Sequence, residues 1–254
     1  MQLGRSQKNY ISDWWWTIDK VLLSSIIFLI IFGIILNLAA SPAIAERLSL
    51  DQYHFVKRQF LFFLFAILTM ISFSFLNFRH LRRISLLIFV SSLLIIFLLN
   101  LFGTPIKGAT RWLDLGLISV QPSEFAKPTY IILVAWFLSE SITANKPGKT
   151  ISFLIYIIFC TGLILQPDVG QTILITLASV IMYFISGMPL FIGIIILFIS
   201  LIGIGLSYLA IDHFQQRLNI FFNPNLGDTY QVDTAYNAIL QGGWFGVGPG
   251  EGVI

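Results

Sequence analysis

Long uncharged apolar stretches recur along this chain, and they constrain its fold more than any other feature. A helix needs ~20 apolar residues to cross a bilayer, and the last of these stretches, residues 169–211, is long enough for two crossings. Its break is predicted at Gly187-Met188-Pro189, because glycine and proline end helices and proline suits a first helical turn. The pattern predicts seven spans, at residues 21–45, 59–78, 84–106, 123–139, 150–167 and the two halves of 169–211.

Composition excludes the main soluble classes. Only 11% of the residues are charged and 57% are hydrophobic, whereas soluble domains carry about 25% charged residues. No cluster of lysine and arginine of the kind that binds nucleic acid is present. Cys160 is the single cysteine, so neither a disulfide framework nor a cysteine metal site is available. The fold class is therefore an all-α polytopic membrane protein.

The domain organisation follows from the spans. The first uncharged stretch is too long for a signal-peptide core of ~7–15 residues, so it is expected to remain as the first span. Basic residues favour a cytoplasmic N-terminus, chiefly through the short turn that holds Arg79, Arg82 and Arg83. We expect a cytoplasmic segment at residues 1–20, a bundle of seven spans at 21–211, and the start of a large external loop at 212–254.

A polar loop before the fourth span carries the first candidate site. GATRWLDLG leads through Gln121-Pro122-Ser123-Glu124 into an apolar helix with Lys127 near its start. Glu124 and Lys127 are three residues apart, which places them on one helix face. Ionisable residues at membrane depth usually line a bundle interior or a cavity. The alternative is an interfacial acid beside a lysine that snorkels to the headgroups, and the pair alone leaves both interpretations open.

A second polar turn, QPDVGQ, joins the fifth and sixth spans on the same predicted side. Asp168 stands at the start of a helix, where a carboxylate suits the positive dipole end, so an N-cap is the simpler interpretation for this residue alone. Arginine suits phosphate because its planar fork binds two oxygens. Convergence of these groups predicts a site for an anionic headgroup, and the candidate binding residues are Arg111, Glu124, Lys127, Gln166, Asp168 and Gln171.

The C-terminal stretch is polar and is expected not to span. Apolar residues at helical spacing predict a short amphipathic helix over 231–241, ended by Gly242-Gly243. Its polar face is neutral to acidic, so we expect it on the outer surface of the bundle rather than as a basic lipid-binding helix. The glycine-rich segment 246–252 is either a flexible turn or an anion-binding nest. It lacks the lysine and the setting of a P-loop.

These motifs together resemble the SEDS family of FtsW, RodA and SpoVE proteins. GATRWLDLG, QPSEFAKP, QPDVGQ and YQVDTAYNAILQGGWFGVGPGEG occur in the family's order among the spans. The start WWWTID, the segment SPAIAERL and the end GGWFGVGPGEG are most similar to the cell-division branch. The resemblance implies a SEDS-type helical bundle with seven of an expected ten spans present, so the chain is expected to be an N-terminal fragment.

Function is likewise implied by the resemblance. It implies a septal peptidoglycan glycosyltransferase of the bacterial inner membrane that polymerises lipid II and releases polyprenyl pyrophosphate. The expected partners are a class B penicillin-binding protein, which is a transpeptidase, and other division proteins. Arg111 and Lys127 are expected to stabilise the pyrophosphate, while Glu124, Gln166 and Asp168 hold these cations.

The catalytic residue itself is not assigned. In the family, the catalytic aspartate lies in a loop motif that follows the GPGEG segment, and that motif is expected beyond Ile254, the last residue of this sequence. The resemblance therefore implies that residues 1–254 are inactive alone. Asp168 is not given the role of this aspartate.

Cofactor and alternative functions stay open at this level. No cofactor or metal site is evident, although a divalent cation on the pyrophosphate is compatible with the sequence. A lipid II flippase is one alternative, and it would need polar groups that continue across the membrane. A non-enzymatic scaffold of the division machinery is the other.

Overall fold

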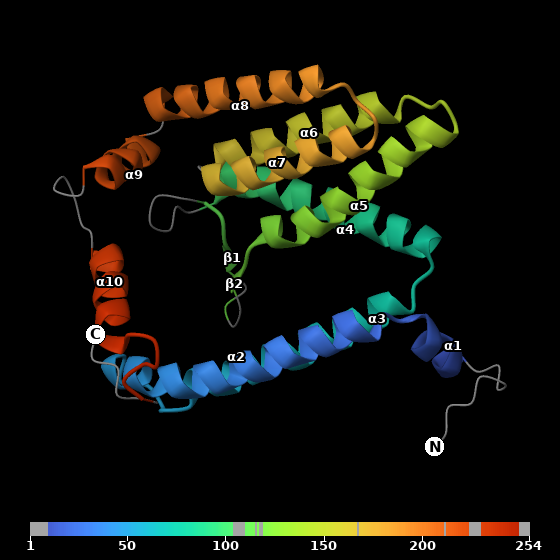
Figure 1. The fold of residues 1–254 in the computed structure, drawn as a ribbon. Coiled ribbons are helices and arrows are strands. Elements are labelled where there is room, and N and C mark those ends of the chain that lie inside the picture. Colours follow the sequence, from blue (N-terminus) through green and yellow to red (C-terminus); the bar gives the residue numbers. More distant parts are fainter. Residues whose placement is uncertain are drawn as a thin grey trace. The chain divides into compact units, whose positions relative to one another are not determined.

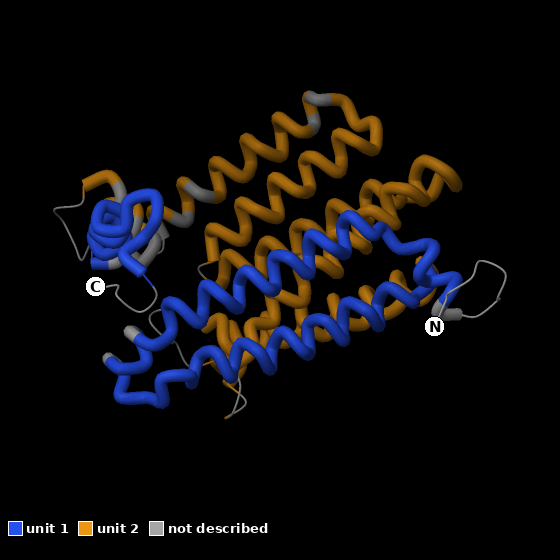
Figure 2. Tube along the Cα trace, turned by 60° about the horizontal axis from the view of Figure 1, so that its bottom comes forward, with its two compact units in different colours: residues 1–77, 228–254 blue, residues 78–227 orange. Residues whose placement is uncertain are grey.

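The structure is a computed structural model, and it describes residues 10–103, 110–114, 116, 119–166, 168–210, 212–223 and 230–248. Within these residues the fold is helical, apart from one short antiparallel hairpin (Figure 1). The chain forms two compact units, residues 1–77 with 228–254 and residues 78–227 (Figure 2). The helices and their apolar composition make this a polytopic membrane protein.

The first unit contains α1 (Tyr10–Thr17), α2 (Lys20–Arg47), α3 (His54–Ser74) and α10 (Tyr230–Gly242). α2 begins after Asp19, whose carboxylate accepts hydrogen bonds from the backbone N–H groups of Val21 and Leu22 at 2.9 and 3.1 Å, an N-cap that satisfies two otherwise unpaired donors. The two long helices pack along each other. No described residue of α3 is buried, as expected for helices that face lipid.

The second unit is a bundle of five long helices, with α9 (Asp212–Phe222) after them. The five are α4 (Phe78–Phe102), α5 (Pro122–Thr143), α6 (Gly148–Leu165), α7 (Val169–Ile185) and α8 (Leu190–Ala210). Each packs against the next along the chain, and α4 also packs on α6 and α5 on α7. The short connections after α5, α6 and α7 favour antiparallel neighbours, whereas the longer polar loop joins α4 to α5.

The core of the second unit surrounds α5. Tyr130 is fully buried, lies 5.4 Å from Phe159 between ring centroids, and shares a 2.6 Å hydrogen bond with Ser179 of α7. Phe89 of α4 completes this aromatic cluster. Because the hydroxyl of Tyr130 has a partner, its burial carries no unpaired polar group. The cluster fixes three helices around the one that bears Glu124 and Lys127.

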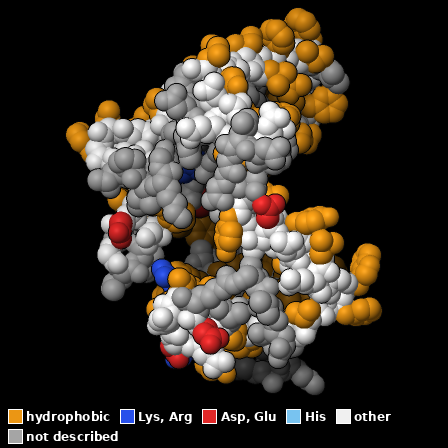
Figure 3. Space-filling view, turned by 90° about the vertical axis from the view of Figure 1, so that its left-hand side faces the viewer, with side chains coloured by type: hydrophobic (Ala, Val, Ile, Leu, Met, Phe, Trp, Pro, Cys, Tyr) orange, Lys and Arg blue, Asp and Glu red, His pale blue; other side chains and the backbone are white. Residues whose placement is uncertain are grey.

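The seven helices α2 to α8 overlap the seven predicted spans, but α3 and α4 begin five and six residues earlier than predicted. The turn predicted at Arg79, Arg82 and Arg83 is therefore part of the start of α4. Within the described residues, four helical segments are long and apolar enough to cross a membrane: Lys20–Pro42, His54–Ser74, Phe78–Phe102 and Gly148–Leu165. α5 carries charged residues and α7 is shorter, with 17 residues. The break between α7 and α8 falls at the predicted Gly187-Met188-Pro189, and Gly187 has a φ of +78°, which glycine adopts without strain. Many large hydrophobic side chains of the described residues are exposed, and the face in Figure 3 shows groups of them with few charged side chains.

Three elements were not predicted. α1 covers the run of three tryptophans at residues 14–16; Trp14 donates a 2.7 Å hydrogen bond to Ser74 and stacks on Phe75. α9 adds a helix in a stretch from which only the helix near 231–241 was expected, and that second helix is confirmed as α10. The hairpin of β1 (Leu113–Asp114) and β2 (Ser119–Val120) replaces part of the polar loop.

Candidate functional site

The polar residues singled out by sequence gather at one end of the second unit, hereafter the site end. Here α4 and α6 finish while α5 and α7 begin. The hairpin pairs Leu113 with Val120 and Asp114 with Ser119. Asp114 accepts a 2.8 Å hydrogen bond from the backbone of Gly116, whose φ of +82° makes the turn. The hairpin thereby connects Arg111 to the start of α5.

Arg111 bridges to the turn between α6 and α7. Its Nε donates to the backbone carbonyl of Gln166 at 3.1 Å, and its Nη1 lies 3.5 Å from Oδ1 of Asp168. The side chains are 20% and 8% exposed, so the ion pair is largely shielded from water. Contact between the two loops confirms that they lie at the same end of the bundle, as the span count requires.

The N-cap interpretation of Asp168 is correct for its position but wrong for the role of its side chain. The residue occupies the N-cap position of α7, but its side chain makes no capping hydrogen bond. Its carboxylate faces Arg111 instead. Attraction to a nearby cation in a shielded site outweighs a hydrogen bond to a helix N–H, which explains the difference.

Gln166 is buried, and its side chain links two parts of the site end. Its side chain is fully enclosed, and its amide donates to the carbonyl oxygens of Thr110 at 3.1 Å and Ile96 at 3.5 Å. It therefore fixes the loop after α4 against the end of α6, and it holds Arg111 through its backbone. Asn100, which the sequence did not single out, adds a similar tie through a 3.2 Å hydrogen bond to the carbonyl of Gly162.

Glu124, Lys127 and Gln171 form a second polar cluster at the site end. The ammonium of Lys127 donates to Glu124 at 2.8 Å and to Oε1 of Gln171 at 2.9 Å. The predicted i, i+3 pair is thus confirmed, and its lysine is only 18% exposed because it also reaches α7. Asp168 and Gln171 stand three residues apart at the start of α7, so this helix end receives both cations.

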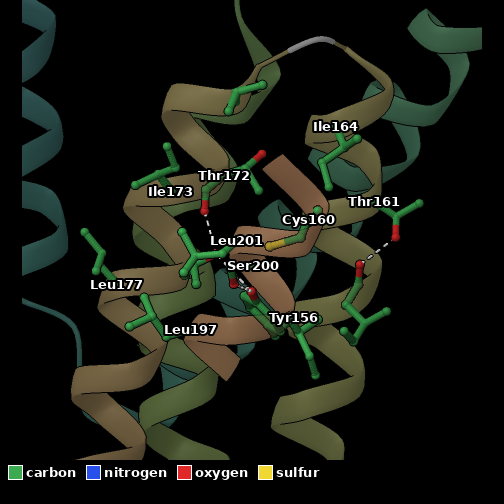
Figure 4. A pocket seen from close by; sticks show the side chains of 15 residues that line it. Tyr156, Cys160, Thr161, Ile164, Thr172, Ile173, Leu177, Leu197, Ser200 and Leu201 are labelled. Carbon is green, nitrogen blue, oxygen red and sulfur yellow. Dashed lines mark hydrogen bonds between the residues drawn. The ribbon is translucent and has the colours of Figure 1, made fainter. Parts of the chain in front are cut away.

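An apolar groove of about 420 Å³ begins beside this helix end and runs between α6, α7 and α8 (Figure 4). Val169, which follows Asp168, is among its lining residues. Its polar groups are paired hydroxyls, with Tyr156 bonded to Thr176 at 2.9 Å and to Ser200 at 3.5 Å. The groove was not expected from sequence, because its lining comes from three helices whose packing the sequence pattern does not give.

No grouping of three His, Cys, Asp or Glu side chains able to hold a metal ion occurs in the described part of the chain. Cys160 is buried and free. Some residues used in the sequence predictions lie outside the described ranges, namely Gly108, Ala109 and Leu115 of GATRWLDLG and Pro167 of QPDVGQ.

The end of the sequence also lies outside the described residues. This applies to the glycine-rich segment beyond residue 248 and to Ile254. The choice between a flexible turn and an anion-binding nest therefore stays open. The expectation that the catalytic aspartate follows Ile254 likewise stays a prediction, and no described residue is assigned as the catalytic base.

Comparison with known proteins identifies relatives whose sequences match nearly the whole chain. A probable peptidoglycan glycosyltransferase FtsW from Caulobacter vibrioides is 38% identical over 253 residues, which cover 99% of this chain and 65% of the relative. A protein of the same name from Escherichia coli is 28% identical, with 92% of this chain and 58% of the relative covered. The chain thus spans roughly six tenths of the length of these relatives.

Solved structures show the same fold. Thermus thermophilus rod shape determining protein RodA matches with a TM-score of 0.60 at 24% identity, covering 74% of this chain and 60% of that protein. A chain from a peptidoglycan synthase complex matches with a TM-score of 0.67 at 24% identity, covering 88% of this chain and 65% of its own. The family model described as cell cycle protein, for FtsW, RodA and SpoVE, matches residues 20–254. Since that match leaves out only the N-terminal segment before α2, the chain belongs to the FtsW, RodA and SpoVE family of cell cycle proteins.

Proposed function

We propose that this protein is a septal peptidoglycan glycosyltransferase, which polymerises lipid II at the outer face of the bacterial inner membrane. Relatives that carry this enzyme's name support the assignment. The observation that carries it is the pairing of Arg111 with the buried residues Gln166 and Asp168, and of Lys127 with Gln171, at one end of the bundle. The N-terminus is cytoplasmic in this proposal, so the site end faces outward.

The chemistry calls for cations at this place. A sugar hydroxyl of one lipid II forms a new bond to the anomeric carbon of the growing chain, and the bond from that carbon to the pyrophosphate breaks. The hydroxyl proton passes to a carboxylate base, and the polyprenyl pyrophosphate leaves with the bonding electrons. Preorganised cations stabilise the charge that develops on the leaving group.

Arg111 and Lys127 supply these cations. Each is held by oxygens of α7 or of the turn before it, so little reorganisation is needed when the pyrophosphate arrives. Asp168 and Glu124 then position the cations, and Gln166 and Gln171 fix the same helix end. Asp168 already pairs with Arg111, which disfavours it as the base. A divalent cation on the pyrophosphate remains compatible with this arrangement.

The groove beside α7 fits the remaining part of the substrate. A polyprenyl chain is long and apolar. The groove has a volume of about 420 Å³ and an apolar lining, and it begins next to Asp168. A headgroup at Arg111 and a tail along α7 would use both features at once. Mostly apolar lining with few placed polar groups is the usual character of a site for such a ligand.

The distribution of polar groups favours the enzyme over a flippase. Deeper in the bundle, the buried polar side chains of the described residues carry neutral hydroxyls, and several of these bond to one another, such as Tyr130 with Ser179 and Tyr156 with Thr176. No described cation lies along that interior. A headgroup carrying two phosphates would find no counter-charge along such a path.

The partner in this proposal is a class B penicillin-binding protein, together with other division proteins at the septum. A structural neighbour comes from a peptidoglycan synthase complex that couples polymerization and crosslinking. A transpeptidase beside the polymerase would place crosslinking next to the site of strand growth.

The test is polymerisation of labelled lipid II in detergent, where flipping between leaflets plays no part. The protein is produced from its complete gene and purified with its class B partner. Arg111→Lys should reduce the rate at least roughly tenfold, a loss of ~1.4 kcal/mol of transition-state stabilisation. Lys146→Gln, at the opposite end of α5, is the matched control and should polymerise normally.

Two results would contradict the proposal. Near-normal polymerisation by Arg111→Lys would remove Arg111 from the site. Binding of lipid II without any polymer from the unmodified complex would favour a flippase or a scaffold instead.

A further inference from the structure

α10 carries an unpartnered apolar stripe. Val232, Tyr236, Ile239 and Leu240 recur at helical spacing, and each is between 62% and 71% exposed. The opposite face bears polar side chains, including Thr234, Asn237 and Gln241. A helix with one apolar face needs a surface to cover that face, because exposed apolar area is unfavourable in water.

The turn after α10 extends this surface. Gly243 and Gly246 have φ values of +53° and +73°, and the backbone N–H of Gly246 donates to Gly242 at 2.7 Å. Between these glycines, Trp244 and Phe245 are fully exposed. The closed turn presents two large aromatic rings at the end of the apolar stripe, and glycine allows it because it adopts positive φ at no steric cost.

Charge distinguishes between the surfaces that this segment could cover. From Tyr230 to Gly248 the only charged residue is Asp233, and the segment has no lysine or arginine. Attraction to anionic headgroups therefore cannot hold it. Tryptophan and phenylalanine beside an amphipathic helix are instead favoured at the boundary between headgroups and acyl chains.

The chain also keeps α10 close to the bilayer. α8 ends at Ala210 and α10 begins at Tyr230, so 19 residues join them. Eleven of these form α9, which rises ~1.5 Å per residue, and extended chain spans at most ~3.5 Å per residue. The reach from the end of α8 is then at most roughly 45 Å. A membrane surface therefore lies within the reach of α10.

We propose that α10 and the Trp244–Phe245 turn form an in-plane membrane anchor, with the apolar stripe buried in the lipid–water interface. Apolar area holds this anchor, so its depth is independent of anionic lipid and of salt. It fixes the loop after α8 to the membrane surface. The anchor itself does not depend on the proposed enzymatic activity.

Depth measurement in nanodiscs tests the anchor. Cys160 is the only cysteine of the sequence, so Cys160→Ala provides a background for single labels. An environment-sensitive fluorophore is attached at Ile239→Cys on the stripe or at Asn237→Cys on the polar face. Nitroxides on the acyl chains of neutral phospholipids should quench the first label, and aqueous iodide should quench the second.

The expected geometry is specific. The label at 239 should lie ~5–10 Å below the headgroup level, and that at 237 should lie ~10 Å shallower, because a helix with its side chains is ~10–12 Å across. Phe245→Cys and Val232→Cys should match the position of 239, which shows that no single label has unwound the helix. High salt or added anionic lipid should leave these depths unchanged.

Three outcomes would overturn the anchor. Equal iodide quenching at 237 and 239 would show a helix in water. A label at 239 shielded from both quenchers would show that protein covers the stripe, whether a partner or a second copy. Insertion only with anionic lipid would show that charge holds the segment.

Discussion

Loss of the Arg111 cation should destabilise the second unit far more than loss of the ion pair between Lys146 and Glu140, which is shorter but exposed. At 3.5 Å, and with an effective dielectric constant of ~20, the attraction between Arg111 and Asp168 is ~5 kcal/mol. Removing one partner leaves the other charge buried, which typically costs ~3–5 kcal/mol. We therefore expect Arg111→Gln to lower the free energy of unfolding by that amount.

Lys146→Gln is the matched control within the same unit. Lys146 lies only 2.6 Å from Glu140, but the side chains are 63% and 28% exposed. Exposed pairs contribute little to stability because water screens them. Arg111→Lys should fall between the two, since it keeps the charge but loses the Nε donor to the carbonyl of Gln166.

The assay is reversible chemical unfolding in mixed micelles, followed by far-ultraviolet circular dichroism. A second variant, Arg111→Met with Asp168→Leu, should recover most of the lost stability, because no charge then remains buried. The reasoning fails if Lys146→Gln costs as much as Arg111→Gln, or if the double variant is no more stable than the single one.

Two further predictions concern the bundle. Reporter fusions after Asn77 and after Ser141 should report cytoplasm and one after Thr104 should report the external side; the reverse pattern would invert the orientation of the site end. Gly162→Val should lower the free energy of unfolding by ~1–3 kcal/mol through overpacking. A Cβ added at Gly162 would lie 3.0 Å from the side chain of Ile96, so the larger valine needs its neighbours to move. Gly205→Val, where a Cβ meets nothing within 4 Å, should cost clearly less in the same experiment, and equal losses would show that close packing is not the cause.

Local rules account for what could be predicted from the sequence. The spans follow from the length of apolar helix that a bilayer requires, and the break at Gly187-Met188-Pro189 follows from backbone preference. The pair of Glu124 and Lys127 follows from helix periodicity, as does the stripe of α10. Each depends only on residues close in the chain, so one sequence is sufficient.

Tertiary structure decided the rest. Lys127 meets Gln171 across 44 residues, and Arg111 meets the carbonyl of Gln166 across 55. Sequence could place these groups at one membrane face, but not choose between an N-cap and an ion pair for Asp168, or between surface and interior for Gln166. Those choices, like the groove between α6, α7 and α8, depend on which helices pack together and on how far each side chain is removed from water, because burial sets the strength of every polar contact.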